Sequence, residues 1–296
     1  MNQLRRVLLD GDPRSTIHDD AAPSMSPLKI GLTLPSFVED PQIPIEVARA
    51  ADAAALDGVF GFEHLFRLAA DGSLRPALDG FTLLGSVAAE TDHIGVGLLV
   101  ARASLRPPEV LAHTFATLDL ISGGRLVVAI GAGDSQSDAE NTAFGVALDT
   151  MEERVARLDA ARAATQARGL STWIGGTAAA VRSIAALADG WNKWGGSAAD
   201  LAVQAAQVRT AAGDKDFVVS WGGLCVLGAT ERIARDKAAE LGAGPRVIVG
   251  GPNEVADRFG AYREAGADWI IVGPLDPSDP ENVGLLAHEI RPLLHD

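Results

Sequence analysis

The chain has 296 residues but only one cysteine, Cys225, which excludes an intramolecular disulfide and leaves no Cys/His spacing typical of a zinc site. Lys and Arg number only 25 against 39 Asp and Glu, and they form no cluster suited to nucleic-acid phosphates. The net charge of −14 also disfavours an anionic membrane surface. No apolar run reaches the roughly 18 residues of a transmembrane helix. We therefore expect a soluble, cytoplasmic protein that binds no metal, nucleic acid or membrane.

Hydrophobic residues make up 47% of the chain, which is enough for one large core. Residues 1–26 are polar, carry three arginines, four aspartates and two prolines, and contain no secretory apolar run. We expect them to form a disordered leader. Residues 27–296 contain no low-complexity linker, so we predict a single domain over that range.

From Leu28 onward, short apolar runs alternate with Ala- and Leu-rich stretches at helical spacing. The predicted strands are 29–34, 58–62, 94–99, 126–130, 172–174, 190–193, 217–221 and 269–272. The predicted helices are 45–56, 81–90, 108–121, 151–167, 178–187, 198–210, 229–241, 252–265 and 283–293. Such alternation requires parallel strands, and eight units favour a closed α/β fold, the (β/α)₈ TIM barrel. A doubly wound sheet is the alternative, but the first strand lacks the G-x-G-x-x-G turn that it would need.

Active sites of such barrels lie at the carboxyl ends of the strands. The second predicted strand runs directly into Glu63 and His64, and a histidine there is suited to proton transfer near neutral pH. Trp194 follows the sixth strand and is the one tryptophan that we predict to contact a ring. Arg67, Arg75, Arg102 and Arg106 lie in loops after the second and third strands, either as solvated charges or as partners of an anionic group.

Two glycine-containing segments follow later strands. Ala132 and Gly133 leave room for a flat ring beside the carboxylate of Asp134, although an isolated Gly-x-Gly is a weak motif. Gly175, Gly176 and Thr177 precede a predicted helix, where free N–H groups would suit a phosphate, with Thr177 as N-cap or ligand. A simple turn is the alternative.

Three segments in this order resemble the bacterial luciferase-like superfamily, especially its coenzyme F420-dependent branch, over nearly all of residues 28–294. The segments are TLDLISGGR with IGAG (117–133), WIGG with ADGWN (173–192), and AGAD (265–268). The resemblance implies a TIM barrel that binds a deazaflavin, coenzyme F420, or alternatively FMN, at the carboxyl ends of its strands. It also implies a homodimer.

By position, the resemblance assigns His64 to the histidine near the reactive edge of the ring, and Glu63 to a position where many members have Asp. Leu98 and Leu99 match a bulge with a non-proline cis peptide behind the ring. Ala132, Gly133 and Asp134 match a segment where some F420 enzymes have an acidic Glu, so His64 and Asp134 are the predicted catalytic residues. The predicted phosphate contacts are Gly175, Gly176 and Thr177.

Two departures from the family concern the substrate. The segment 168–171 is very short where relatives carry a long insertion over the active site, which predicts a more open pocket or one completed by another subunit. Leu68 stands where some F420 dehydrogenases have an aromatic residue, which argues against a sugar-phosphate substrate.

The leading prediction is an F420-dependent oxidoreductase that transfers hydride between the deazaflavin and a small organic substrate. An FMNH₂-dependent monooxygenase of the same fold and a non-catalytic flavin- or deazaflavin-binding protein are the alternatives. A barrel with a Schiff-base lysine is the rival from outside the family, and Lys193 is its candidate on the later strands.

Overall fold

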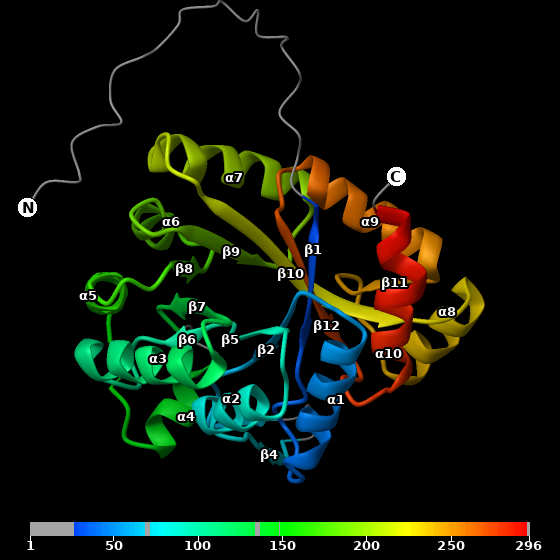
Figure 1. Cartoon of the computed structure of the whole chain (residues 1–296), viewed down its shortest axis with the longest axis horizontal. Helices are drawn as coiled ribbons and strands as arrows, with labels where there is room; N and C mark the ends of the chain where they lie inside the picture. The colour runs from blue at the N-terminus through cyan, green and yellow to red at the C-terminus, as the bar shows by residue number, and fades with distance from the viewer. Residues whose placement is uncertain (1–26, 69–71, 134–136, 148, 295–296) are drawn as a thin grey trace, which may run out of the picture.

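Eight parallel strands close into a barrel in this computed structural model, which describes residues 27–68, 72–133, 137–147 and 149–294. The strands run in the order β1-β2-β5-β7-β8-β9-β10-β12, and β12 pairs back to β1 (Figure 1). Their bounds are β1 (Lys29–Thr33), β2 (Gly58–Gly61), β5 (Gly95–Leu98), β7 (Leu126–Gly131), β8 (Thr172–Gly175), β9 (Gly190–Trp194), β10 (Val218–Leu227) and β12 (Trp269–Pro274). The predicted barrel and its eight strands are confirmed. The predicted leader, 1–26, lies outside the described residues.

Helices connect the barrel strands and cover the outside of the barrel (Figure 1). They are α1 (Gln42–Ala53), α2 (Gly80–Ala89), α3 (Pro108–Ser122), α5 (Met151–Gln166), α6 (Ala179–Ala185), α7 (Ala198–Ala212), α8 (Glu231–Glu240), α9 (Pro252–Glu264) and α10 (Glu281–Gly284). A π-helical turn (Leu285–Ile290) and a 3₁₀ turn (Arg291–Leu294) extend α10. None of the described helices has both the length and the hydropathy needed to cross a bilayer.

Several helix ends follow directly from local sequence. Thr150 caps α5 in a reciprocal arrangement with Glu153, and Ser197 caps α7 in the same way with Asp200. Pro108 occupies the first turn of α3, where its missing N–H is not needed. These boundaries agree with the predicted helices to within a few residues.

Neighbouring strand residues enter two separate cores. Val59 packs in the larger cluster between the barrel and its helices, whereas Phe60 belongs to a cluster inside the barrel. This inner cluster consists of Phe60, Leu99, Ala129, Trp173, Trp269 and Ile271. The alternation follows the two-residue period of a strand. It fixes which strand residues are buried beneath the mouth of the barrel.

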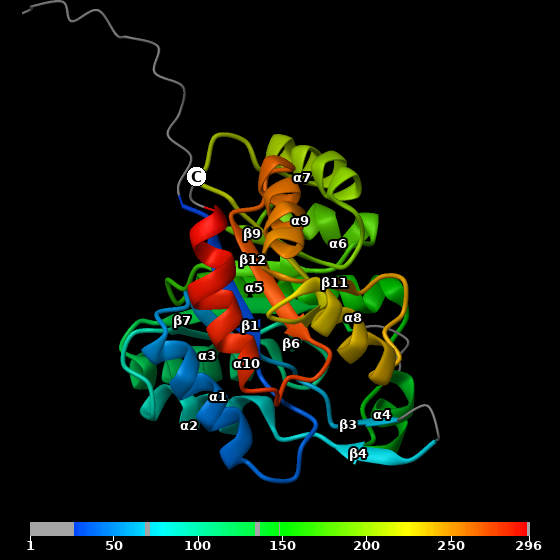
Figure 2. The ribbon, with the colours of Figure 1, turned by 90° about the vertical axis from the view of Figure 1, so that its right-hand side faces the viewer.

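Five elements were not predicted from the sequence. They are the antiparallel hairpin of β3 (Phe66–Leu68) and β4 (Leu74–Pro76), the short strand β6 (Ala101–Arg102), the short helix α4 (Asp138–Ala143), and β11 (Ile248–Gly250) on the edge of β10. Figure 2 shows β3, β4 and α4 together at one end of the molecule. They follow the carboxyl ends of β2 and β7, so they border the mouth where the predicted site residues lie.

Candidate functional site

Aromatic side chains form a continuous arc across the carboxyl end of the barrel. The arc consists of Phe37, Phe62, His64 and Trp194. The ring centres of Phe62 and Trp194 are 5.9 Å apart, those of Phe37 and Phe62 are 6.3 Å apart, and those of Phe37 and His64 are 5.7 Å apart. All four side chains are partly exposed. The arc therefore places the two predicted residues His64 and Trp194 on one accessible aromatic surface.

Glu63, which follows β2, connects the end of this strand to β6 through a hydrogen bond. Its side chain is buried, with Oε2 accepting the backbone N–H of Arg102 at 2.5 Å and Oε1 accepting from the Arg106 guanidinium. Burial raises the pKa of the Glu63 carboxyl, although the charge of Arg106 and the bond from Arg102 oppose that rise. Both of its carboxylate oxygens are thus engaged by the protein. The contacts indicate that Glu63 shapes the mouth rather than facing it.

His64 contacts a buried carboxylate that the sequence analysis missed. Its Nδ1 lies 2.7 Å from Oε1 of Glu140 on α4, and Oε2 of the same carboxylate accepts the Leu65 N–H at 2.5 Å. Burial opposes the ionisation of Glu140, but the Leu65 N–H, the His64 ring and the nearby Arg102 charge hold its pKa below the ordinary value. Arg102 Nη1 lies 3.0 Å from Oε1.

Arg102 on β6 contacts both Glu140 and Asn141 of α4. Its side chain is 4% exposed, and its guanidinium also donates to the side-chain oxygen of Asn141. Neither Glu140 nor Asn141 follows a predicted strand, so the strand-end rule did not select them. The available sequence signal was a polar segment, SDAEN (137–141), which begins a few residues beyond the glycine-containing end of the fourth barrel strand.

A non-proline cis peptide lies in the short segment between β5 and β6, as the resemblance implies. It joins Leu99 and Val100, one residue beyond the predicted pair of Leu98 and Leu99, because Leu98 still belongs to the regular part of β5. The Val100 side chain packs on the ends of β7 and β8. A Cβ added to Gly131 or Gly175 would lie 2.4 Å from a Val100 methyl group, so both positions require glycine.

Gly133 leaves open space after β7. Its φ is +72°, and a Cβ added there would meet Arg102 Nε and Arg154 Nη2 at 4.0 Å, with no closer atom among the described residues. Arg154 Nε donates to the Ala132 carbonyl at 3.0 Å and holds this segment in place. The predicted catalytic residue Asp134 lies outside the described residues.

The predicted phosphate loop differs in detail from the expectation. The Gly176 N–H is not free, because it donates to the Asn192 carbonyl at 3.1 Å, and Gly175 is accounted for by packing against Val100. The N-cap of α6 is Ala178, so Thr177 precedes it and is exposed. No hydrogen bond within the described ranges uses the N–H groups of Thr177, Ala179 or Ala180, as expected for a first helical turn.

Positive charge accompanies this turn. The Arg182 guanidinium donates to the Thr177 carbonyl, and Lys193 lies close enough to Arg182 to sense its charge. Lys193 is buried, and its Nζ donates to the Gln204 side chain at 3.0 Å. Burial lowers the pKa of Lys193, with Asp200 opposing and Arg182 reinforcing that effect. The hydrogen bond to Gln204 fits a structural role for the Lys193 ammonium.

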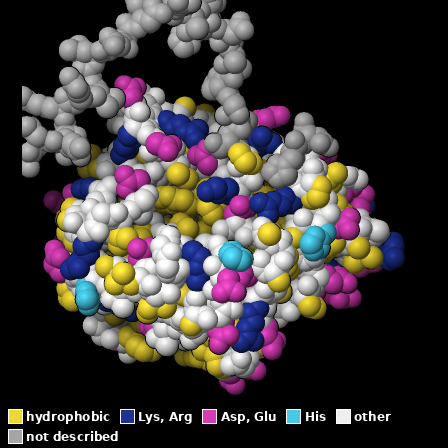
Figure 3. Space-filling model, in the orientation of Figure 1, with side chains coloured by type: hydrophobic (Ala, Val, Ile, Leu, Met, Phe, Trp, Pro, Cys, Tyr) yellow, Lys and Arg dark blue, Asp and Glu magenta, His cyan; other side chains and the backbone are white. Residues whose placement is uncertain are grey.

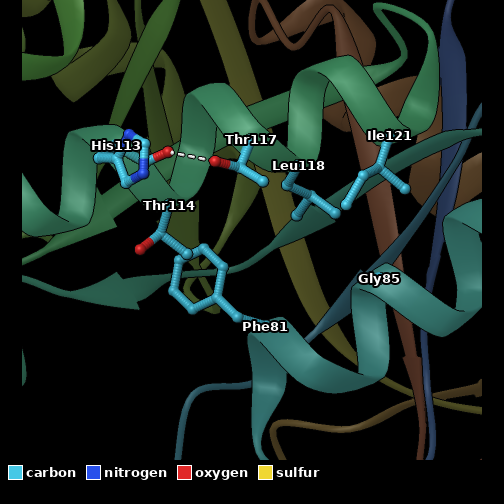
Figure 4. Close-up of a pocket in the computed structure, with 7 residues that line it drawn as sticks. All are labelled: Phe81, Gly85, His113, Thr114, Thr117, Leu118 and Ile121. Atoms are coloured by element: carbon cyan, nitrogen blue, oxygen red, sulfur yellow. Dashed lines mark hydrogen bonds between the residues drawn. The ribbon is translucent and has the colours of Figure 1, made fainter.

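Other surfaces of the molecule lie apart from this mouth. On the face seen in Figure 3, acidic and basic side chains are interspersed rather than gathered by sign. A groove of about 270 Å³ lies between α2 and α3 on the outside of the barrel, where Gly85 leaves room beside His113, Thr114 and Thr117 (Figure 4). Among the described residues, no group of three or more His, Cys, Asp or Glu side chains is arranged to hold a metal ion.

Comparison with protein families and curated proteins identifies matches that each cover less than half of the chain. Residues 25–167 match the family of luciferase-like monooxygenases. An F420-dependent glucose-6-phosphate dehydrogenase of Nakamurella multipartita is 32% identical over 45% of this chain, and the match spans only 38% of that protein's length. A dibenzothiophene-sulfone monooxygenase of Rhodococcus erythropolis is 34% identical over 32% of this chain and 20% of its own length.

Solved structures resemble the whole barrel. An F420-dependent secondary alcohol dehydrogenase, solved with an F420–acetone adduct, has a TM-score of 0.78 at 15% identity and covers 92% of this chain and 100% of its own. EDTA monooxygenase from Chelativorans sp. BNC1 has a TM-score of 0.75 at 16% identity, with 91% and 94% covered. At these identities the likeness establishes the barrel fold.

Proposed function

We propose that this chain, whose residues 25–167 match the luciferase-like monooxygenase family, is a cytoplasmic F420-dependent oxidoreductase that moves hydride between the deazaflavin and a small organic substrate. The observation that carries the proposal is the position of His64 on an accessible aromatic surface at the barrel mouth. His64 follows β2, which pairs with β5, and the cis peptide lies just beyond the end of β5. The similarity to an F420-dependent glucose-6-phosphate dehydrogenase and to an F420-dependent secondary alcohol dehydrogenase supports the same assignment.

The residues at the mouth fit a flat, polyanionic cofactor. The aromatic arc offers ring surfaces, and the glycine backbone at Gly133 leaves space that a side chain would fill. The unused N–H groups of Thr177 and Ala179 beside Arg182 suit a phosphate. When bound, the deazaflavin supplies two-electron hydride chemistry, and the protein supplies position and electrostatics. In this assignment Trp194 contacts the ring, while Leu99, Ala132 and Gly133 border it.

His64 is the proposed proton donor or acceptor beside the reacting carbon, and Asp134 is proposed to tune or share that role. Glu63 holds the β2 end in place through its bonds to β6. We do not extend the glucose 6-phosphate substrate of the relatives to this chain, because Leu68 stands where some F420 dehydrogenases have an aromatic residue.

Titration with F420 and, separately, with FMN tests the cofactor assignment. We expect micromolar binding of F420 and much weaker binding of FMN, followed by absorbance and fluorescence on the purified full chain. Bound F420 should then be reduced by simple secondary alcohols, or its reduced form oxidised by the corresponding ketones, at a rate that depends on enzyme concentration.

The alternatives predict different results from the same titration. Preferred FMN binding would favour a monooxygenase that uses reduced flavin and oxygen, in line with the two monooxygenases among the relatives. Tight cofactor binding without turnover would favour a binding protein. Binding of neither cofactor would refute the proposed function and leave only the barrel.

We also propose that the chain forms a homodimer through the outer face of α3. Val110, Leu120 and Ile121 are exposed apolar residues on this helix, and Ile121 borders the groove in Figure 4. We expect light scattering to give twice the 30.7 kDa mass of one chain. Ile121→Asp should lower that mass, whereas Leu187→Asp, a matched change at another exposed apolar residue, should not. A wild-type mass of one chain would exclude the dimer.

A further inference from the structure

We infer that Glu140 is a positioning residue that fixes the His64 ring with its hydrogen on Nδ1, so that proton transfer takes place at Nε2. The inference deepens the proposed function and rests on it for the chemistry. The placement of the hydrogen itself rests only on the contacts of the protein. These contacts come from α4, a helix that is separate in sequence from the strand end carrying His64.

Glu140 holds both the ring and the backbone of the same short segment. Its Oε1 contacts His64 Nδ1 at 2.7 Å, while its Oε2 accepts the N–H of the next residue, Leu65, at 2.5 Å. The Glu140 side chain is 3% exposed, so water competes little for either oxygen. Two anchors on consecutive residues fix the position of the ring and its rotation about Cβ more firmly than one bond to a mobile side chain would.

The neighbours of Glu140 decide which atom carries the hydrogen. The Leu65 N–H donates to this carboxylate, and the positively charged Arg102 guanidinium lies beside it, with Nη1 3.0 Å from Oε1. They favour the ionised form, which has no hydrogen of its own to give. A 2.7 Å contact between an ionised carboxylate and Nδ1 therefore requires the hydrogen on Nδ1. The lone pair of the neutral imidazole then lies on Nε2.

Nε2 is directed away from this buried cluster. No hydrogen bond to it is found within the described part of the chain, whereas Nδ1 is fully engaged. The His64 side chain is 35% exposed and borders the Phe37 ring on the aromatic arc. The accessible edge of the imidazole is thus the edge that carries Nε2, and this edge meets a substrate at the mouth.

The assignment gives a balanced reaction in either direction. When an alcohol is oxidised, its hydroxyl proton would pass to Nε2, and a bound oxidised deazaflavin would supply the two-electron acceptor for the hydride released as the C–H bond breaks. The C=O bond forms from the electrons left by the departing proton. The imidazolium that results keeps its Nδ1 hydrogen on the Glu140 carboxylate. In the reverse direction the Nε2 proton goes to the carbonyl oxygen.

Long-range ¹H–¹⁵N spectra of the uniformly ¹⁵N-labelled full chain test the inference without cofactor or turnover. The chain contains six histidines, and the His64 signals are identified by their loss in His64→Gln. At a pH where the imidazole is neutral, we expect the Nδ1–H tautomer for His64. A wild-type spectrum showing the hydrogen on Nε2 would overturn the inference, whatever the activity of the protein.

Kinetics of Glu140 variants give a second, independent readout. In Glu140→Gln, one of the two carboxylate oxygens is replaced by an NH₂ group, which cannot accept a hydrogen bond from either His64 Nδ1 or the Leu65 N–H. We therefore expect kcat to fall by about 10–100-fold, with KM and cofactor Kd nearly unchanged. Glu140→Asp should recover part of the loss. Asp138→Asn, an exposed carboxylate on the same helix, is the matched control and should behave as wild type. Unchanged kcat in Glu140→Gln would exclude a positioning role.

The two readouts separate this inference from the proposed function. If the chain binds no F420, the proposed function fails, but the spectra still decide where the hydrogen of His64 lies. If F420 turnover is observed and the spectra show the Nε2–H tautomer, the function stands and the role of Glu140 fails.

Discussion

Replacing His64 by alanine is expected to lower turnover with F420 by about 10²–10⁴-fold, the usual contribution of a positioned general acid or base. The reason is that His64 is the titratable side chain of the aromatic arc, with one ring edge anchored on a buried carboxylate and the other accessible. Cofactor affinity should stay within about tenfold of wild type, because an alanine leaves Phe62, Trp194 and the rest of the ring surface in place. Single-turnover absorbance of bound F420 separates chemistry from binding.

A histidine elsewhere on the barrel supplies the control for this experiment. His113 lies on α3 and lines the outer groove between α2 and α3 (Figure 4), and no residue of the aromatic arc lines that groove. His113→Ala should retain wild-type turnover. If His64→Ala also retains it, His64 has no part in the reaction, and a carboxylate such as Asp134 would have to move the proton instead.

The sequence was sufficient for the barrel because each strand and helix has its own periodicity. Local apolar patterns locate the eight barrel strands and nine of the ten α-helices among the described residues, and closure follows from their alternation. The strand-end rule also selected His64 and Trp194, since His64 lies shortly after the end of β2 and Trp194 is the last residue of β9. These are the parts of the structure that depend on short stretches of chain.

The rest of the candidate site depends on contacts between distant segments. Glu140 is 76 residues from His64, and nothing in its own neighbourhood indicates that its carboxylate reaches the second strand. The glycine at position 175 looks like a phosphate contact in sequence, but the Val100 side chain explains it through packing. Side-chain partners across the barrel mouth are set by tertiary structure, which a pattern along the chain does not contain.

Replacing Phe60 by alanine is expected to cost about 3–5 kcal/mol of the free energy of unfolding, the range for removing a buried aromatic side chain from a packed core. Phe60 is fully buried inside the barrel and packs edge-to-face on Trp269, with ring centres 5.9 Å apart. Urea unfolding followed by tryptophan fluorescence measures the loss. Phe144→Ala removes an exposed phenylalanine and should change stability by no more than about 0.5 kcal/mol.

The space that Phe60 occupies is provided by glycines on neighbouring strands, and this gives a sharper form of the same prediction. A Cβ added to Gly31 on β1 would lie 2.7 Å from the Phe60 ring, so Gly31→Ala alone should cost about 1–3 kcal/mol through overpacking. In a Phe60→Leu background the smaller side chain leaves room for the new methyl group, and the cost of Gly31→Ala should fall. Strictly additive effects of the two changes would mean that Gly31 is needed for another reason. A coupling of about 0.5–3 kcal/mol would establish that glycine on one strand and phenylalanine on the next are a matched pair in the barrel core.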